Sequence, residues 1–569
     1  MQMKERVDFC IIVPPAGATK TIYPPYGSMY IASALRGKGF HTRILNVDLE
    51  RMSNATVTER IREINPKYIG FSGIVAPSYK YIKNLSSELR NVFHDKIQIL
   101  GGGLAAAVEP IFQNTAIDII VQGEGDLTIV EVMDCLGNNK DLSSVRGIYY
   151  REGTSYNYTG KRSLIANLDS LPYPAFDLID MDKYMPDGVE FTKDPRSNVS
   201  LNRKIYDPKR SRKMITIPTS RGCFGECSFC FRAYKGIRVH SMKYVFDFIE
   251  YCIDKFNVGF FSFGDECFAP NKSRNWAFIE EYKKRKMDFI FRIIGMRVDT
   301  VDQEILRAYR EIGCWMIEYG FESGSQKILD IMNKMVTVEQ NRQVALWTKE
   351  AGIFTSPALV LGMPGETNQT VQETINFVKS LDFGFKQYQY TYALPIPGSA
   401  LYEYAKIAGA IDNEDEYLSS LEGEVSGAHF FHVNVSDEPD HVVTGWGEKL
   451  KNELDIAFFY SRHKNLFIAK LMCLIAKISL LYQSGTLLKI LARRVRTFFA
   501  SLLHLKQPSG PQKGHGRFRK KGDIQIEAFL KSNDPGSPDH GVPLKIINQR
   551  LRIGDTKFEQ RDATREEAT

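Results

Sequence analysis

The sequence lacks the marks of a secreted protein. Its first residues, MQMKERVDFCIIVPP, show no signal-peptide pattern, and its nine cysteines are odd in number. We therefore expect reduced thiols in the cytoplasm rather than a disulfide framework. With 43% hydrophobic and 25% charged residues, the composition is that of a globular enzyme, and 569 residues are enough for two or three domains. No internal repeat is evident.

Acidic residues are missing from Ile456 to Gly522, where Lys and Arg together number 14. Subtracting these 14 positive charges from the net charge of +7 leaves −7 for the rest of the chain. The basic character is therefore local, and it does not indicate nucleic-acid binding by the whole protein.

Two apolar segments lie within this basic region. NLFIAKLMCLIAKISLLY resembles a membrane span, but Lys470 and Lys477 interrupt it two helical turns apart and so share one face. LLKILARRVRTFFASLL carries Lys489, Arg493 and Arg496 at a similar spacing. We expect amphipathic helices with a basic stripe. They either contact an anionic membrane surface from its cytoplasmic side or pack their apolar faces on the protein.

Short apolar runs alternate with helical patterns from the amino terminus to about Leu136. The runs DFCIIVPP, TRILNVD, YIGFSGIV, IQILGGG and IDIIVQGEG are rich in Ile and Val, as buried strands are. Strand–helix alternation predicts an α/β fold, so we expect residues 1–142 to form a doubly wound, Rossmann-like parallel sheet. Ligands of such a sheet bind at the carboxyl ends of its strands.

A second alternation occupies residues 214–408. It contains six strand–helix units, whereas a full eight-unit barrel needs roughly 250 residues, so a partial (β/α)6 barrel is expected. Residues 143–213 are rich in Pro and Asp and are predicted to be a linker. Residues 409–505 are expected to be a helical C-terminal domain, and the Pro/Gly-rich residues 506–569 a disordered tail.

The stretch SRGCFGECSFCF places Cys223, Cys227 and Cys230 in one loop directly after a predicted strand. A structural zinc site needs a fourth ligand, and His240, Cys252 and Cys267 stand in no paired spacing with the trio. Three thiolates can instead hold three irons of a [4Fe–4S] cluster, which leaves the fourth iron open to an exchangeable ligand. The cluster is the preferred interpretation, with zinc as the alternative.

The spacing C-x3-C-x-aromatic-C resembles that of the radical S-adenosylmethionine superfamily, in particular its cobalamin-binding, class B methylase-like branch. Further motifs of this resemblance are FSFGDECF, IEYGFESGSQKILDIMNK, LVLGMPGET and YALPIPGSALYEYA, which together with the trio extend from Met214 to about Ala408. The resemblance implies a [4Fe–4S] cluster on the three cysteines and S-adenosylmethionine at the open iron. It further implies contacts to S-adenosylmethionine from Phe229, Gly264, Asp265, Glu266, Arg297, Glu322, Ser323 and Gly362.

Many members of this branch carry a cobalamin-binding domain before the barrel, and Val7 to Leu136 looks similar. The resemblance implies that Ser72 approaches the nucleotide tail of the corrin. It also implies that glycine lets the backbone come close to that tail at Gly101, Gly102, Gly103 and Gly123. The D-x-H-x-x-G loop, whose His ligates cobalt, is absent after the first strand. A domain of this type that binds no cofactor is therefore the alternative.

The resemblance implies a radical enzyme that methylates an unactivated carbon of a small-molecule or lipid-like substrate, with an anionic electron donor such as a flavodoxin or ferredoxin. Two alternatives stay open. One is a radical cyclase or rearrangement enzyme that transfers no methyl group, and the other is a zinc-stabilised scaffold without catalysis.

Overall fold

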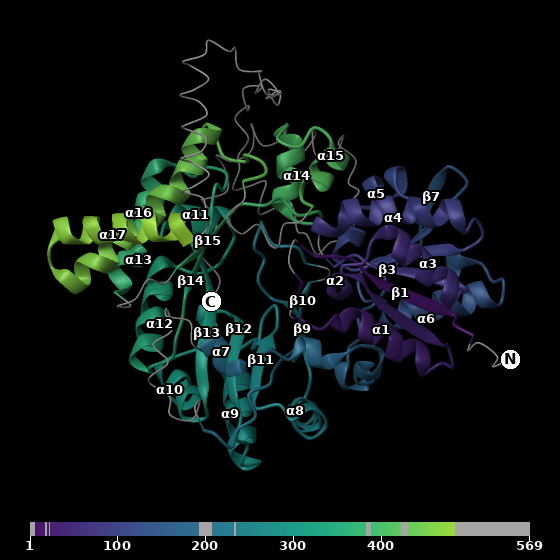
Figure 1. Ribbon diagram of the computed structural model, residues 1–569, viewed down its shortest axis with the longest axis horizontal. Helices are drawn as coiled ribbons and strands as arrows, with labels where there is room; N and C mark the ends of the chain where they lie inside the picture. The colour runs from purple at the N-terminus through teal and green to yellow at the C-terminus, as the bar shows by residue number, and fades with distance from the viewer. Residues whose placement is uncertain are drawn as a thin grey trace, which may run out of the picture.

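The computed structural model of the chain describes residues 6–17, 20–21, 23–74, 76–192, 207–232, 235–382, 388–422 and 431–483. Two α/β units lie side by side, one purple to blue and one teal, with green helices over their junction (Figure 1). Each unit is built around its own parallel sheet.

The first sheet has the strand order β2-β1-β3-β4-β5-β6-β7, and its first five strands are parallel. The order 2-1-3-4-5 is that of flavodoxin-like folds, so the predicted doubly wound sheet is confirmed. The strands are β1 (Phe9–Val13), β2 (Thr42–Asn46), β3 (Tyr68–Ser72), β4 (Ile97–Gly101), β5 (Ile119–Val121), β6 (Ile148–Glu152) and β7 (Ser155–Tyr158). The helices of this unit are α1 (Tyr26–Arg36), α2 (Val47–Glu50), α3 (Asn54–Ile64), α4 (Tyr79–Val92), α5 (Val108–Asn114) and α6 (Gly125–Gly137).

The antiparallel strands β6 and β7 come from the segment predicted to be a linker. They continue the sheet beyond β5, and the rings of Tyr149 and Tyr158 stack across the pair at 4.3 Å. Alternating tyrosines suit a strand that is only half-buried, which is why this stretch lacks the apolar runs of the parallel strands.

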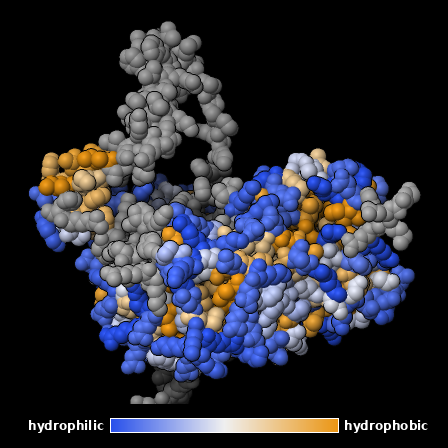
Figure 2. All heavy atoms as spheres, turned by 60° about the horizontal axis from the view of Figure 1, so that its bottom comes forward, coloured by the Kyte–Doolittle hydropathy of each residue, from blue (hydrophilic) through white to orange (hydrophobic). Residues whose placement is uncertain are grey.

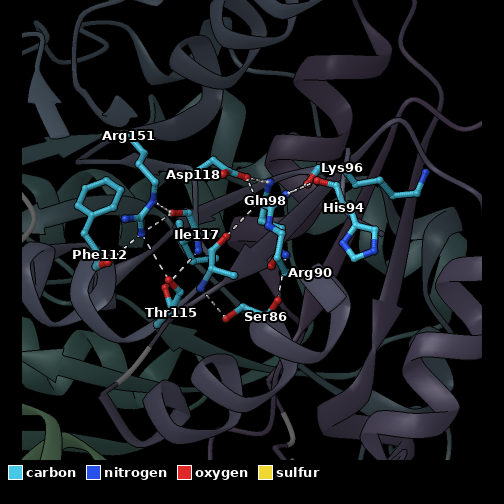
Figure 3. Close-up of polar contacts among 11 residues, drawn as sticks. Ser86, Arg90, His94, Lys96, Gln98, Phe112, Thr115, Ile117, Asp118 and Arg151 are labelled. Atoms are coloured by element: carbon cyan, nitrogen blue, oxygen red, sulfur yellow. Dashed lines mark hydrogen bonds and ion pairs between the residues drawn. The ribbon is translucent and has the colours of Figure 1, made fainter. Parts of the chain in front are cut away.

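A polar network ties the amino ends of β4 and β5 to the neighbouring helices (Figure 3). Arg90 of α4 pairs with Asp118, whose carboxylate also accepts the backbone N–H of Gln98 at 2.7 Å. Arg151 donates to the carbonyls of Phe112 at 2.8 Å and Ile117 at 3.2 Å. The network lies opposite the carboxyl edge of the sheet, so it stabilises the fold and leaves that edge free.

The second sheet has the order β15-β14-β13-β12-β11-β8, and all its pairings are parallel. The predicted six-stranded partial barrel is therefore confirmed. The strands are β8 (Met214–Ile217), β11 (Phe260–Gly264), β12 (Ile290–Met296), β13 (Cys314–Glu322), β14 (Pro357–Leu361) and β15 (Gln389–Tyr392). The helices are α7 (Gly188–Thr192), α8 (Met242–Phe256), α9 (Lys272–Lys284), α10 (Gln303–Glu311), α11 (Gln326–Ile331), α12 (Val338–Glu350) and α13 (Asn368–Leu381).

Local chemistry explains where these helices begin. Ser241 and Asp302 precede α8 and α10, and each side chain accepts a backbone N–H of the first turn. Thr337 forms a reciprocal capping box with Gln340 at the start of α12. A short hairpin, β9 (Ser220–Cys223) with β10 (Gly236–Val239), interrupts the alternation between β8 and α8.

The helices α14 (Ala400–Ile407), α15 (Glu414–Ser420), α16 (Asp440–His463) and α17 (Leu466–Gln483) follow the barrel. Asp415 of α15 accepts from Tyr79 Oη at 2.6 Å and Lys83 Nζ at 2.7 Å, so this region is anchored on the first unit. Of the helices that the structure describes, none has the length and apolarity needed to cross a membrane. The predicted basic helix near Arg493 and the predicted tail lie outside the described residues.

Candidate functional site

The cysteine loop begins where β9 ends, at Cys223, on the carboxyl side of the second sheet. Two thiols surround Gly225, because a Cβ on this residue would lie 3.3 Å from Cys223 Sγ and 3.8 Å from Cys227 Sγ. The N–H of Gly225 also donates to Cys223 Sγ at 3.3 Å. Cys227 is buried, Cys223 is half-buried and Cys230 is exposed. The loop therefore presents two thiols beside a glycine, and its third cysteine, Cys230, is exposed to solvent.

Positive charge is packed against this loop. The guanidinium of Arg297 lies 4.6 Å from the ring centroid of Phe224, and its Nη1 is 2.9 Å from the position of a Cβ on Gly225. Its Nη2 donates to the carbonyl of Lys334 at 3.3 Å, and Asp299 pairs with the same guanidinium at 2.8 Å. Arg297, expected to contact S-adenosylmethionine, thus also braces the cysteine loop.

The surroundings favour the thiolate form of Cys223. A hydrogen bond with Cys267 lowers the pKa of this thiol below its ordinary value, and the N–H of Gly225 and the charges of Arg297 and Lys334 act in the same direction. Burial acts in the opposite direction on the other two thiols, because it raises the pKa of Cys227 and raises that of Cys230 to about 12. Cys223 is therefore the thiol of the three that most readily gives the thiolate, the form that binds metal.

The zinc alternative requires several ligands grouped around a single ion. Within the described ranges, no three His, Cys, Asp or Glu side chains are grouped so that they could hold a metal ion. The thiolates of a [4Fe–4S] cluster each bind a different iron, so they stand further apart than ligands of a single ion.

Asp265 and Glu266, which follow β11, have different surroundings. Asp265 is buried, and its carboxylate accepts the N–H groups of Thr219 at 2.7 Å and Ser220 at 2.6 Å and the hydroxyls of both residues. These donors lie at the start of β9, so the side chain of Asp265 positions the strand that carries Cys223. The predicted contact of Asp265 with S-adenosylmethionine stays a prediction. Because its carboxylate is already engaged with β9, Asp265 is less well suited to that contact than Glu266.

Glu266 is solvent-accessible, yet desolvation raises the pKa of its carboxyl to about 7, and the nearby Cys223 acts in the same direction. Asp265 is buried against β9, whereas Glu266 is exposed to solvent, where a ligand can reach it. Gly264, just before it, is exposed, and a Cβ there would approach Thr216 Cγ2 to 2.7 Å. Glu266 is therefore the better placed of the two acids to meet a ligand's ammonium group.

Glu322 and Ser323 end β13 but point to different neighbours. Glu322 has a φ of +60° and pairs with the buried Lys334 at 2.7 Å, close to the cysteine loop. Ser323 is fully buried, and its hydroxyl lies 3.0 Å from the hydroxyl of Thr374 on α13. Although the two residues are adjacent in sequence, only Glu322 lies beside the cysteine loop.

Gly362 follows β14 with a φ of +85°, and a Cβ there would lie 3.2 Å from Val443 of α16. The N–H of Met363 donates to Glu366 Oε2 at 3.2 Å, and the N–H of Gly362 donates to the same oxygen. Burial raises the pKa of the Glu366 carboxyl to about 8. Glu366 therefore shapes the turn in which Gly362 lies.

The predicted cobalamin residues lie at the carboxyl ends of β3, β4 and β5. Ser72 ends β3 and Gly101 ends β4, and the N–H of Gly73 donates to the carbonyl of Gly101 at 2.8 Å. A Cβ on Gly101 or on Gly123 would meet nothing within 4 Å, so both positions open onto space that a ligand can fill. This open edge fits the tail of a corrin.

Gly102 and Gly103 are required by the protein itself. Gly102 has a φ of +97°, and a Cβ there would lie 2.7 Å from the carbonyl oxygen of Gly73. A Cβ on Gly103 would lie 2.6 Å from the carbonyl oxygen of Ile74 and 3.3 Å from Phe231 Cε1. Phe231, at the end of the cysteine loop, therefore reaches the edge of the first sheet.

Phe229 is half-buried and packs against the hydrophobic cluster that both units share. Its neighbour Ser228 anchors the loop, because its N–H donates to the carbonyl of Met332 at 2.8 Å and its carbonyl accepts from Leu401 N at 2.9 Å. The aromatic position of the motif is thus anchored through the backbone of the residue that precedes it.

The interior of the barrel holds a polar group that includes Arg292, a residue that was not predicted from the sequence. Arg292 Nε donates to Ser262 Oγ at 2.9 Å, and its Nη1 lies 4.0 Å from Glu318 Oε1. Burial raises the pKa of the Glu318 carboxyl. Lys334 and Glu366 were missed as well, since a single Lys or Glu in a helical or turn pattern gives no sign of its burial.

Comparisons with known proteins agree on both units. The family model "Radical SAM superfamily" matches residues 217–378, and the model "B12 binding domain" matches residues 14–133. An uncharacterized methyltransferase of Pyrococcus horikoshii is 27% identical over 412 residues, which cover 71% of this chain and 84% of the relative.

Two further likenesses concern the reaction and the fold. The anaerobic magnesium-protoporphyrin IX monomethyl ester cyclase of Cereibacter sphaeroides is 28% identical over 364 residues, which cover 62% of this chain and 56% of that protein. The structure of the cobalamin-dependent S-adenosylmethionine radical enzyme OxsB, with aqua-cobalamin and S-adenosylmethionine bound, superposes with a TM-score of 0.60. At 15% identity over 96% of this chain and 81% of that one, it shares the fold.

Proposed function

Because the chain is a radical SAM protein with an N-terminal cobalamin-binding domain, we propose that it methylates an unactivated carbon of a small molecule. The observation that carries the proposal is the contact between the two sites. Phe231 of the cysteine loop lies 3.3 Å from the Cβ position of Gly103, at the carboxyl edge of the first sheet. A methyl donor held at that edge and a radical generated at the cysteine loop would thus share one space.

The proposal assigns some residues of the chain to the iron–sulfur cluster and others to S-adenosylmethionine. Cys223, Cys227 and Cys230 would hold the [4Fe–4S] cluster, and Glu266 and Glu322 would contact S-adenosylmethionine. When bound, the cluster with S-adenosylmethionine supplies the radical and the corrin supplies the methyl group. The protein orients these groups and keeps water and oxygen away from them.

The test uses full-length protein purified without oxygen, reconstituted with iron, sulfide and hydroxocobalamin, and reduced with titanium(III) citrate. With methyl-deuterated S-adenosylmethionine and a small-molecule cell extract as the source of the methyl acceptor, we expect S-adenosylhomocysteine and 5′-deoxyadenosine to form together. Cys223→Ala should lose 5′-deoxyadenosine, whereas Cys135→Ala, in the first unit, should keep it. Release of 5′-deoxyadenosine alone by the wild-type protein would contradict methyl transfer.

The cyclase relative favours a second candidate, a radical cyclisation or rearrangement without methyl transfer. The deuterium label separates the two candidates, because only a methyltransferase places it in the product. Arg292 and Glu318 in the barrel interior would contact a polar group of the substrate in either case.

Helix α17 is the proposed membrane contact. Among the side chains of α17 that the structure describes, only those of Ala469 and Cys473 are buried, whereas Phe467 is 76% exposed. The other exposed apolar side chains are Leu466, Ile468, Leu471, Leu474 and Ile475. Figure 2 shows this apolar surface in orange at one end of the molecule. An apolar patch of this kind marks an interaction site, and the 14 basic residues between Ile456 and Gly522 suit anionic lipid.

Flotation with phosphatidylcholine vesicles, with and without phosphatidylserine, tests this contact. We expect binding to the anionic vesicles only, and its loss in Phe467→Ser/Leu471→Ser. Val92→Ser, which removes an exposed apolar side chain from the end of α4, is the matched control. Equal flotation of the three proteins would rule out α17 as the lipid contact. An anionic electron donor such as a flavodoxin or ferredoxin is proposed to supply the electron for the cluster.

A further inference from the structure

The hairpin that leads into and out of the cysteine loop carries two arginines at directly opposite positions. Arg221 on β9 is the register partner of Arg238 on β10. Like charges that face each other across a strand pair destabilise it unless other groups neutralise them. The hairpin therefore needs acidic partners.

Those partners come from the first unit. Asp126 binds Arg221 with both oxygens, at 2.7 Å to Nη1 and 3.0 Å to Nη2. Glu124 accepts from Arg221 Nη1 at 3.0 Å through one oxygen and from Arg238 Nη1 at 2.7 Å through the other. Two carboxylates thus neutralise two guanidinium groups that are 95 to 114 residues away in sequence.

The four side chains are well shielded from water. The side chains of Glu124 and Asp126 are 4% and 6% exposed, and those of Arg221 and Arg238 are 18% and 16% exposed. The ring of Tyr30 on α1 lies 5.2 Å from the guanidinium of Arg221. Charge-assisted, bidentate contacts in such surroundings are strong and directional, unlike exposed ion pairs.

The four side chains stand next to both proposed cofactor sites. Arg221 is two residues before Cys223, the first thiol of the loop, and Glu124 follows Gly123 at the open edge of the first sheet. On the other side of the loop, Phe231 contacts Gly103. The cysteine loop is therefore fastened to the first unit at both of its ends.

We propose that Glu124, Asp126, Arg221 and Arg238 form an interdomain clamp that sets the position of the cysteine loop relative to the edge where the corrin binds. The inference rests on the proposed function, because that proposal places the corrin at the edge of the first sheet. The four side chains are positioning residues, because they act through the strand that carries Cys223.

Asp126→Asn is the variant of choice, since it keeps the shape of the side chain and removes its charge. Glu131→Gln is the matched control. Glu131 lies on the same helix and binds Arg162 through both oxygens, at 2.6 and 2.7 Å, but contacts no part of the hairpin. Arg221→Lys is the second variant, which keeps the charge and loses the two-pronged contact.

Two measurements on the reconstituted full chain report on position rather than on turnover. The first is the magnetic interaction between the reduced cluster and cob(II)alamin in electron paramagnetic resonance. The second is hydrogen exchange of the backbone amides of β9 and β10. We expect Asp126→Asn and Arg221→Lys to weaken and broaden the magnetic interaction. Exchange should quicken about tenfold or more, in Asp126→Asn because the charge of Arg221 then keeps only Glu124 as its partner, and in Arg221→Lys because lysine cannot make the two-pronged contact.

Iron content should stay within about twofold of wild type in each variant, and Glu131→Gln should match the wild-type protein in both measurements. An unchanged magnetic interaction and unchanged exchange in Asp126→Asn and Arg221→Lys would overturn the clamp. Failure of the proposed function has a different signature. A wild-type protein that binds both cofactors and forms no S-adenosylhomocysteine would contradict methyl transfer and leave the two clamp measurements unaffected.

Discussion

Replacing Asp265 by alanine tests what holds the cysteine loop to the second sheet. The carboxylate accepts the backbone N–H groups of Thr219 and Ser220 at 2.7 and 2.6 Å, together with both hydroxyls. Each buried N–H that loses its partner costs about 1–3 kcal/mol, so the two together cost about 2–6 kcal/mol. Because β9 carries Cys223, the variant should also lose much of its iron.

Anaerobic urea unfolding measures the loss of stability, and iron analysis after reconstitution measures the effect on the loop. Asp265→Asn is the control, since its amide oxygen can still accept both backbone N–H groups, and it should retain most of the stability and iron. If Asp265 served only the amino group of S-adenosylmethionine, the alanine variant would keep the wild-type unfolding free energy and iron content and would lose only ligand binding. That result would refute the role assigned to its four hydrogen bonds.

Three further predictions concern Cys223, Lys334 and Glu366. Cys223→Ala should lose iron and 5′-deoxyadenosine formation together, as measured on the same reconstituted sample, while Cys135→Ala keeps both. Lys334→Met should destabilise the protein by about 3–5 kcal/mol, because Glu322 is then buried without its cation, and adding Glu322→Gln should recover part of the loss in a double-mutant cycle. The raised pKa of Glu366, about 8, means that the folded protein binds this proton more tightly than the unfolded chain. Its contribution to stability is therefore complete below pH of about 4.5 and lost as the pH rises to about 8, so Glu366→Gln should flatten urea midpoints across this range.

Hydrophobic patterning predicted both sheets because parallel strands are buried on both faces. Runs such as FCIIV and FFSFG are continuous apolar segments, and no competing structure buries them as well. The antiparallel strands β6 and β7 escaped prediction, since their tyrosines alternate with polar residues and resemble a loop. Their place in the first sheet follows from packing against β5, a contact that local sequence does not encode.

The candidate site also contains some residues that the sequence predicts and others that it does not. The three cysteines are recognisable because three thiols at this spacing are unusual at the level of sequence, whereas the strand-end glycines are expected only through the resemblance to cobalamin-binding domains. Asp126 and Arg221 are ordinary charged residues, and their meaning depends on a contact between segments 95 residues apart. Lys334 looks like a surface lysine until the fold places its ammonium group 2.7 Å from Glu322. Such roles arise from tertiary structure alone.

The ring of Phe231 stands between two glycines that belong to different parts of the chain. A Cβ on Gly398, just before α14, would lie 2.9 Å from this ring, and a Cβ on Gly103 would lie 3.3 Å from it. The three residues therefore form one packing unit, in which a larger side chain at either glycine would displace the loop. A chimera that takes its first unit from a relative would have to carry all three positions over together, and the same constraint limits how independently the two halves of this protein can evolve.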